Sequence, residues 1–442
     1  MFVGKKIFVF GMARSGYEVA KLLLKRNCDV IVSDLKEQNK EHVEEIVKLG
    51  GNVVITEHPE ELIDDTFDYI VKNPGIRKDH VCLKKAKTLN IPIINEVELA
   101  YKLLPKVKII GITGSNGKTT TTTLTYNILK SAKVNVHLGG NIGYPLSSLV
   151  DKVNENDTLL LEISDHQLCD MYDFKTDISV FTNVSPTHLD FHESYEVYKK
   201  MKHRIFNHHT SNDIAILNKD NEELLELTKD IASKKYYFSS LEKADIYYED
   251  GFIICPNYLK LDVSTLKIKG SHNYENIMAC ILICKTLNIP SFIVIDEINN
   301  FNGVEHRIEY VEEVNGVLFY NDSKSTNNVA TITALKSFNR PIILLMGGLN
   351  RGQSYDELLP YMGNVKKVIC FGETKNKIND FCIENSILCE MVDCLKEALK
   401  ISVESSENGD VVLLSPAHAS WDQYDSFEIR GNEFKEEVNN LK

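Results

Sequence analysis

The chain has 442 residues, enough for about three domains, and its 43% hydrophobic and 26% charged residues are ordinary for a globular protein with large buried cores. Its formal net charge of −13, from 63 acidic and 50 basic residues, disfavours nucleic acid and anionic membrane surfaces as partners. No apolar run approaches the roughly 18 residues that span a bilayer. The ten cysteines form no C-x-x-C pair, which indicates a reducing, cytoplasmic compartment.

The first block of the chain begins with a strand pattern, KKIFVF, rather than with a signal peptide. The glycine turn GMARSG, a helical stretch and the strand DVIVSD follow, and this order predicts a parallel sheet. The turn keeps the first and third glycines of the dinucleotide fingerprint G-x-G-x-x-G, but Ala13 replaces the middle one. Asp34 ends the second strand, where dinucleotide enzymes hold a ribose. Taken alone, this block is compatible with an NAD-dependent oxidoreductase.

The second block contains a glycine loop between a strand, KVKIIGITG, and a helical stretch, TTTTTLTYNILKSA. The common phosphate-binding loop, G-x-x-x-x-G-K-[ST], would place a glycine at position 112, where the chain has Ile112. Backbone N–H groups of Gly114 to Thr119 could nevertheless cradle phosphates at the helix N-terminus. Lys118 would then reach the terminal phosphates, and the Thr119 hydroxyl would hold Mg²⁺. The plainer alternative is a tight strand-to-helix turn with a surface lysine.

Further strand patterns continue both this block and a third one. DTLLLEIS, DISVFTNVS and DIAILNKD are short apolar runs typical of buried parallel strands, and residues 252–274 alternate as an antiparallel patch would. After FNGVEHR, four strand patterns each end in a polar or glycine-rich turn: GVLFYNDSKSTN, RPIILLMGG, KKVICFGE and GDVVLLSPAHAS. We expect ligands at these turns, because parallel sheets bind ligands beyond the carboxyl ends of their strands.

These blocks predict an α/β protein of three domains. They are an N-terminal Rossmann-like domain (1–97), a central P-loop ATPase domain with a mainly parallel sheet (98–303), and a C-terminal Rossmann-like domain (304–442).

The loop TGSNGKTT resembles the ATP loop of the Mur ligase family, T-G-[ST]-[ND]-G-K-[ST], and this explains its unusual spacing. The resemblance extends along the whole chain through GGNIG, LLEIS, NVSPTHLDFH, GSHNYEN, EHR, NDSKSTN, MGG and LLSPAHASWDQYDSFEIRGNEF. It implies an ATP- and Mg²⁺-dependent amide ligase that forms an acyl phosphate. The implied substrates are UDP-N-acetylmuramoyl-L-alanine and D-glutamate, in the synthesis of bacterial peptidoglycan precursors. We expect a cytoplasmic monomer that binds small molecules and neither nucleic acid nor membrane.

The resemblance also implies the catalytic and metal-binding residues. The catalytic candidates are Lys118, Glu162, His188 and Lys202, and the metal ligands would be Thr119, Glu162, His188 and Lys202 as a carbamate. An amine must be neutral to react with CO₂, so we expect Lys202 to be buried with a lowered pKa, and Lys199 and Lys200 to face solvent. The plainer alternatives are a strand-end carboxylate, a structural histidine and a solvated lysine.

Three binding sites follow from the same resemblance. The ATP site would comprise Gly114, Ser115, Asn116, Gly117, Lys118, Thr119, Thr120, Asn276, Arg307, Asp322 and Lys324. The uridine-nucleotide substrate would contact Arg14, Ser15, Asp34, Asn73, Gly75, Asn141 and His188. The incoming amino acid would contact Thr326, Arg351, Ser420 and Phe427, of which Arg351 could instead be a solvated loop residue and Phe427 a core residue.

Several positions depart from the family pattern. Asp165 and His166 stand in place of the more usual S-S-F-Q-L sequence, and Thr187 stands where an aspartate often precedes the histidine. His418, Trp421 and Arg351 alter the motifs near the amino-acid site. These changes bear on substrate geometry more than on reaction type. The alternatives are another Mur-type ligase, a folylpolyglutamate-type ligase and a non-catalytic ATP-binding sensor of the same fold.

Overall fold

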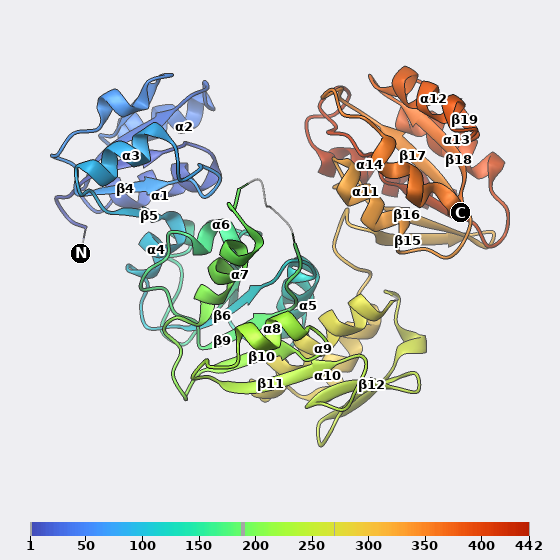
Figure 1. Ribbon diagram of the computed structural model, residues 1–442, viewed down its shortest axis with the longest axis horizontal. Coiled ribbons are helices and arrows are strands. Elements are labelled where there is room, and N and C mark those ends of the chain that lie inside the picture. Colours follow the sequence, from blue (N-terminus) through green and yellow to red (C-terminus); the bar gives the residue numbers. More distant parts are fainter. Residues whose placement is uncertain (1, 187–190, 269, 442) are drawn as a thin grey trace. The chain divides into compact units, whose positions relative to one another are not determined.

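The computed structural model describes residues 2–186, 191–268 and 270–441. The chain divides into two compact units, the first comprising Met1–Ser264 and Ser271–Ile298 and the second Thr265–Gly270 and Asn299–Lys442. Within the described residues, the first unit contains a five-stranded and a nine-stranded sheet, and the second a six-stranded sheet, with helices covering the sheets (Figure 1). The expected α/β class with mainly parallel sheets is confirmed.

The five-stranded sheet is parallel throughout and has the order β3-β2-β1-β4-β5. Its strands are β1 (Lys6–Phe10), β2 (Asp29–Asp34), β3 (Asn52–Ile55), β4 (Tyr69–Lys72) and β5 (Ile93–Asn95). Its helices are α1 (Arg14–Leu24), α2 (Lys40–Lys48), α3 (Val81–Thr88) and α4 (Glu96–Tyr101), with the 3₁₀ turn η1 (Pro59–Leu62). The strand order reverses between β1 and β4, which is where doubly wound sheets bind ligands.

The turn between β1 and α1 requires its glycines. Gly11 has φ +94°, and a Cβ atom on Gly16 would lie 1.9 Å from the carbonyl oxygen of Gly11. The first turn of α1 can therefore approach the end of β1 only because position 16 lacks a side chain.

The nine-stranded sheet has the order β14-β13-β12-β11-β10-β9-β6-β8-β7. Its strands are β6 (Lys108–Thr113), β7 (Val136–Gly140), β8 (Thr158–Glu162), β9 (Ile178–Phe181), β10 (Ile214–Asn218), β11 (Lys234–Ser239), β12 (Ile246–Glu249), β13 (Phe252–Cys255) and β14 (Leu259–Asp262). It is parallel from β7 to β12, and β12, β13 and β14 pair antiparallel. The expected antiparallel patch is therefore confirmed, but it ends at Asp262, and Ser271 begins a helix instead.

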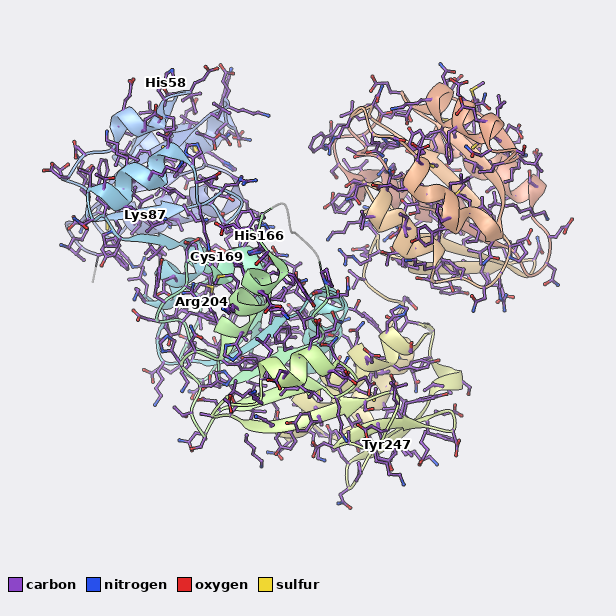
Figure 2. The ribbon with its side chains drawn as sticks, in the orientation of Figure 1. His58, Lys87, His166, Cys169, Arg204 and Tyr247 are labelled. Atoms are coloured by element: carbon purple, nitrogen blue, oxygen red, sulfur yellow. The ribbon has the colours of Figure 1, made fainter. Side chains whose placement is uncertain are left out.

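The helices that accompany this sheet are α5 (Lys118–Ser131), α6 (Asp165–Leu168), α7 (Tyr195–His203), α8 (Glu222–Leu227), α9 (Ser271–Thr286) and α10 (Ser291–Asn300). Three 3₁₀ turns are η2 (Leu146–Ser148), η3 (Arg204–Phe206) and η4 (Val263–Thr265). Arg204 donates to the carbonyl oxygens of Cys169 and Met171 and so connects the end of α7 to the segment after α6 (Figure 2).

Helix α5 forms although threonine is a poor helix former. Thr121, Thr122 and Thr125 are fully buried, and the Thr125 hydroxyl donates to the carbonyl oxygen of Thr121 at 2.6 Å. The same hydroxyl lies 3.3 Å from the sulfur of Cys280 on α9. Packing against α9 thus outweighs the weak intrinsic propensity.

The six-stranded sheet has the order β15-β16-β20-β17-β18-β19. Its strands are β15 (Glu309–Val314), β16 (Val317–Asn321), β17 (Ile342–Gly347), β18 (Val365–Phe371), β19 (Cys389–Met391) and β20 (Val411–Leu414), and only the β15–β16 pairing is antiparallel among those described. The helices are α11 (Asn328–Leu335), α12 (Lys375–Glu384), α13 (Leu395–Ser405) and α14 (Phe427–Asn439), with the 3₁₀ segment η5 (Asp356–Asn364). Apolar side chains cover both faces of this sheet, so its central strands are buried.

Polar contacts join the five-stranded and nine-stranded sheets of the first unit. The Lys72 ammonium at the end of β4 lies 2.9 Å from the Asp170 carboxylate, and both side chains are almost fully buried. The Glu96 carboxylate accepts a hydrogen bond from the N–H of Ser147, and burial raises the pKa of Glu96 to about 7. None of the described helices is both long enough and apolar enough to cross a bilayer.

Candidate active site

The loop between β6 and α5 has a conformation that only glycine allows at two positions. Gly114 has φ +149°, and a Cβ atom there would lie 1.9 Å from Oγ1 of Thr182. Gly117 has φ +81°, and its Cβ would lie 2.1 Å from Oδ1 of Asn276 on α9. The loop therefore lies against β9 and α9 and leads directly into the N-terminus of α5. A glycine loop at a helix N-terminus is suited to binding phosphate groups.

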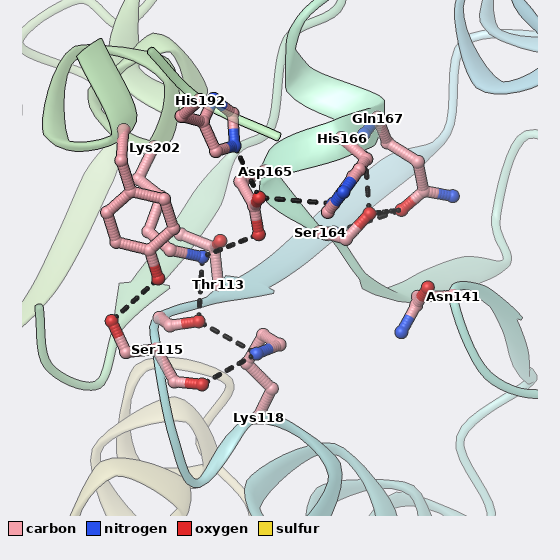
Figure 3. A network of polar contacts seen from close by, with 12 residues as sticks. Thr113, Ser115, Lys118, Asn141, Ser164, Asp165, His166, Gln167, His192 and Lys202 are labelled. Carbon is pink, nitrogen blue, oxygen red and sulfur yellow. Dashed lines mark hydrogen bonds and ion pairs between the residues drawn. The ribbon is translucent and has the colours of Figure 1, made fainter. Parts of the chain in front are cut away.

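The loop is held by side chains from the segment after β9 and from α7. Ser115 Oγ lies 2.7 Å from the hydroxyl of Tyr198 and accepts a hydrogen bond from the N–H of Ser185 at 2.9 Å. The N–H of Asn116 donates to Oδ1 of Asn183 at 2.9 Å. The Lys118 ammonium donates to the loop carbonyls of Gly114 and Ser115, so its charge lies over the loop (Figure 3).

Lys202 of α7 is fully buried beside this loop. Its ammonium donates to the carbonyl oxygen of Gly114 at 2.8 Å and to Oδ1 of Asp165 at 3.4 Å. Burial and the charge of Lys118 lower the pKa of Lys202 to about 7, although Asp165 opposes this shift. Lys200 is exposed, as the sequence predicted, whereas the Lys199 side chain is only 16% exposed and pairs with Glu196. A neutral amine at this position is therefore accessible near neutral pH.

Glu162 ends β8 next to β6, with its side chain buried. Oε1 accepts a hydrogen bond from Nδ2 of Asn141 at 2.7 Å, and the N–H of Asn141 donates to the carbonyl oxygen of Glu162 at 2.8 Å. Oε2 is buried and has no hydrogen-bond partner within the described residues. A buried carboxylate oxygen without a donor is the kind of group that a cation stabilises.

Asp165 lies at the centre of a polar cluster (Figure 3). Its Oδ2 lies 2.7 Å from Nε2 of His192 and 3.1 Å from Nδ1 of His166. Burial opposes ionisation of Asp165, but the hydrogen bond from His166, the charge of Lys202 and the hydrogen bond from His192 hold the pKa of this carboxyl well below its usual range. His192 was not among the predicted site residues, although it stands in the same NVSPTHLDFH segment as His188. His188 and Thr187 lie outside the described residues.

The candidates for the uridine nucleotide that belong to the five-stranded sheet lie at the carboxyl ends of β1, β2 and β4, whereas Asn141 follows β7 of the nine-stranded sheet. Asp34 accepts hydrogen bonds from the N–H groups of Met12 at 2.7 Å and Lys36 at 3.1 Å, so it shapes the turn before α1. Asn73 accepts from the N–H of Gly75 at 3.1 Å. Arg14 and Ser15 begin α1, and the Arg14 guanidinium lies 5.7 Å from the ring centre of Tyr144 in the segment after β7.

In the second unit, Asp322 organises the turn that follows β16. Its buried carboxylate accepts hydrogen bonds from the N–H of Ile308 at 3.1 Å and from the Ser415 hydroxyl at 2.7 Å, and burial raises its pKa to about 6. The Lys324 ammonium lies 5.6 Å from the ring centre of Phe427. Arg307 is exposed, and Asn276 belongs to the first unit, where it contacts the Thr121 hydroxyl.

Three of the four candidates for the amino acid lie on loops at the carboxyl ends of β16, β17 and β20, and the fourth, Phe427, begins α14. The Arg351 guanidinium lies 4.8 Å from the ring centre of Trp421, and both side chains are exposed. Ser420 is buried, and its hydroxyl has no hydrogen-bond partner within the described residues. Thr326 and Phe427 are half-buried.

Sequence reasoning missed Arg430, which is fully buried behind these loops. Its guanidinium donates to the side chain and carbonyl of Ser323 and to the carbonyl of His418, with a longer contact to the carbonyl of Gly347. His418 in turn lies 2.9 Å from the Tyr355 hydroxyl, and burial lowers its pKa to about 4, so it is neutral at physiological pH. Arg430 stands in the C-terminal motif LLSPAHASWDQYDSFEIRGNEF, and this was the only sign of its importance in the sequence. The motif does not reveal that Arg430 contacts the turns at the strand ends.

A phosphate-binding loop beside a buried lysine and a buried carboxylate, on a mainly parallel sheet, defines a nucleotide-using α/β protein. Family models match most of the chain: the Mur ligase MurD-like N-terminal domain over residues 5–95, the Mur ligase middle domain over 112–284, and the Mur ligase glutamate ligase domain over 306–418. The chain therefore belongs to the Mur ligase family.

Two similar relatives carry the same name. The UDP-N-acetylmuramoylalanine–D-glutamate ligase of Listeria innocua is 40% identical to this chain. The alignment covers 100% of this chain and 98% of that protein. The ligase of the same name from Enterococcus hirae is 41% identical, with 99% of this chain and 96% of that protein covered.

Two solved structures share the fold. The UDP-N-acetylmuramate-alanine ligase MurC of Thermotoga maritima aligns with a TM-score of 0.59 at 20% identity, over 99% of this chain and 100% of that one. The MurF ligase of the same organism, solved with ADP, aligns with a TM-score of 0.55 at 18% identity, over 100% and 96%.

Proposed function

We propose that this protein is an ATP-dependent amide ligase that adds D-glutamate to UDP-N-acetylmuramoyl-L-alanine in bacterial peptidoglycan precursor synthesis. The observation that carries this proposal is about 40% identity over the full chain to relatives of that name. The loop formed by Gly114 to Thr119, with Lys202 and Glu162 beside it, supports the same reaction type.

The reaction needs an activated carboxyl group, because a free carboxylate does not acylate an amine. Transfer of the ATP γ-phosphoryl group to the substrate carboxylate gives an acyl phosphate, which the amine of D-glutamate attacks with release of phosphate. In this proposal the backbone of Gly114 to Thr120 binds the ATP phosphates, and Lys118 balances their charge. Asn276 on α9 lies against Gly117 and would contact the nucleotide.

The residues present fit a Mg²⁺ ion. Oε2 of Glu162, which has no hydrogen-bond partner among the described residues, and the Thr119 hydroxyl are oxygen donors of the kind that Mg²⁺ prefers. His188 and Lys202, as a carbamate, would complete a second metal site, and the lowered pKa of Lys202 supplies the neutral amine that reacts with CO₂. When bound, the ions neutralise charge on the phosphoryl group during transfer.

We assign the substrates to three domains with the boundaries 1–97, 98–303 and 304–442. The first would bind the uridine nucleotide through Arg14, Ser15, Asp34, Asn73 and Gly75, and Asn141 and His188 would contact its sugar-peptide part. The third would supply Arg307, Asp322 and Lys324 on the ATP side, and Thr326, Arg351, Ser420 and Phe427 for D-glutamate. Arg351 could pair with a carboxylate of the amino acid. We further propose that the enzyme acts as a monomer in the cytoplasm.

Phosphate release tests the proposal. Purified protein is given Mg·ATP and UDP-N-acetylmuramoyl-L-alanine with D-glutamate, L-glutamate, L-lysine or meso-diaminopimelate in parallel, beside a Lys118→Ala control. Release that depends on D-glutamate and is lost in the control is the expected result. Release with another amino acid would overturn the substrate, and ATP binding without release would favour a non-catalytic sensor.

A further inference from the structure

Asp165, His166 and His192 bring three metal-binding types of side chain to one point, and we call them the Asp–His–His cluster. Both imidazoles face the same carboxylate oxygen, at 2.7 Å for His192 and 3.1 Å for His166 (Figure 3). One donor atom from each residue lies within 4.8 Å of the other two. Three residues from two separate segments therefore converge on a single position.

The spacing within the cluster matches a metal site. Around a tetrahedral ion with metal–nitrogen bonds of about 2.1 Å, neighbouring donor atoms are about 3.4 Å apart. The observed separations of 2.7 and 3.1 Å are hydrogen-bond lengths in the cluster without an ion, so each imidazole nitrogen must move less than about 1 Å from Oδ2 to reach the spacing of a bound ion.

The cluster is rigid on the Asp165 side and open on the His166 side. Ser164 and Gln167 form a capping box at the start of α6, which fixes Asp165 and His166. The His192 side chain is 1% exposed and that of Asp165 is 3% exposed, whereas that of His166 is 24% exposed. The ring of Phe191 lies 4.0 Å from the ring of His166. An ion could thus enter past His166 and bind against the two buried ligands.

We propose that the Asp–His–His cluster binds a divalent transition-metal ion, of the class of Zn²⁺ or Co²⁺. Imidazole nitrogen favours these ions, whereas Mg²⁺ prefers oxygen donors such as Glu162. Three protein ligands leave a coordination position for water. The donor set shares no residue with the Mg²⁺ ligands proposed above, so this is a separate site.

The ion would also connect two elements that flank the loop. Asp165 and His166 begin α6, which follows β8, and His192 precedes α7, which carries Lys202. An ion bound by Asp165 and His192 would connect the start of α6 to the segment just before α7, whether or not Lys202 carries a carbamate. The bound metal is therefore a positioning element for α7, and it should raise the unfolding temperature of the first unit by mass action.

Titration with Co²⁺ in excess Mg²⁺ tests the proposal, because Mg²⁺ fills the oxygen-rich sites and Co²⁺ bound through imidazole absorbs visible light. The unmodified protein should bind one equivalent of Co²⁺ with visible bands, and Zn²⁺ should displace it. His166→Asn and His192→Asn should each weaken binding by at least about tenfold. Glu162→Gln should retain the bands.

His137→Asn is the matched control, because His137 also lies 2.9 Å from a carboxylate, that of Asp157, but no third metal-binding side chain joins this pair in the part of the chain that the structure describes. This variant should bind Co²⁺ as the unmodified protein does. Equal Co²⁺ affinity in the unmodified protein and both cluster variants would overturn the proposal, as would no binding in excess Mg²⁺. Circular dichroism with EDTA checks folding, and if His192→Asn is unfolded, the more exposed His166→Asn decides the outcome.

Discussion

Two buried carboxylates, Glu162 and Asp165, lie three residues apart and have different surroundings. Asp165 is surrounded by His166, His192 and Lys202, which supply positive charge and N–H donors. Glu162 receives one donor, from Asn141, and keeps a buried oxygen without a partner within the described residues. Protein groups thus balance the charge of Asp165 when the Asp–His–His cluster holds no ion, whereas Glu162 is arranged for a cation that comes with the nucleotide.

Glu162→Gln should abolish most ligase activity and leave the fold intact. The amide oxygen can still accept the hydrogen bond from Asn141, but the negative charge is lost. We expect kcat to fall by about 10²- to 10³-fold and the Mg²⁺ concentration for half-maximal rate to rise. Asp157→Asn, which changes a buried carboxylate beside the opposite end of β8, is the control and should leave kcat unchanged. Equal loss in both variants would contradict a metal-binding role for Glu162.

Glu96 should make the stability of the first unit depend on pH. Burial raises its pKa from 4.5 to about 7, so the folded state keeps a proton that the unfolded state has lost. The contribution of protonated Glu96 to the free energy of unfolding is therefore fully present below about pH 4.5 and is lost as the pH rises through about 7. Glu96→Gln removes this dependence and should stabilise the protein by up to about 3 kcal/mol at pH 8 but little at pH 5. The unfolding temperatures of Glu96→Gln and of the unmodified protein at pH 5 and pH 8 measure this effect. The same difference between the two proteins at both pH values would disprove it.

At the scale of an element, the glycine loop depends on neighbours that are distant in sequence. Gly114→Ala would place a Cβ 1.9 Å from the Thr182 hydroxyl at φ +149°. We expect a loss of about 2–4 kcal/mol in the free energy of unfolding and much weaker ATP binding, because the loop must move away from β9. Gly363→Ala is the matched control, since a Cβ there has no heavy atom within 4 Å and φ is not positive. Calorimetry and nucleotide titration of both variants compare them directly, and similar losses would show that the close contact is unimportant.

The strands and the glycine loop could be predicted from the sequence, because the patterns that indicate them lie within short stretches of the chain. Apolar runs that end in glycine or polar turns predict parallel strands, and the pattern Gly114 to Thr119 predicts a nucleotide loop. His192 and Arg430 could not be assigned in this way, because their partners, Asp165 and the Ser323 turn, lie 27 and 107 residues away. The prediction that Lys202 is the buried lysine of α7 came from the family resemblance, because the helix pattern alone does not distinguish it from Lys199 and Lys200.

At the scale of the whole molecule, polar contacts join the five-stranded and nine-stranded sheets of the first unit, and the Lys72–Asp170 pair is the most buried of the ion pairs described between them. Removal of one partner leaves an uncompensated buried charge, so Lys72→Met and Asp170→Leu should each cost about 3–5 kcal/mol. The double variant should cost clearly less than the sum, because both charges are then absent. Urea unfolding followed by circular dichroism measures the cycle. Trp421, the single tryptophan, lies in the second unit, so its fluorescence should report an unchanged transition there in every variant. Strictly additive costs would mean that the two charges do not stabilise one another, and that apolar packing joins these two sheets.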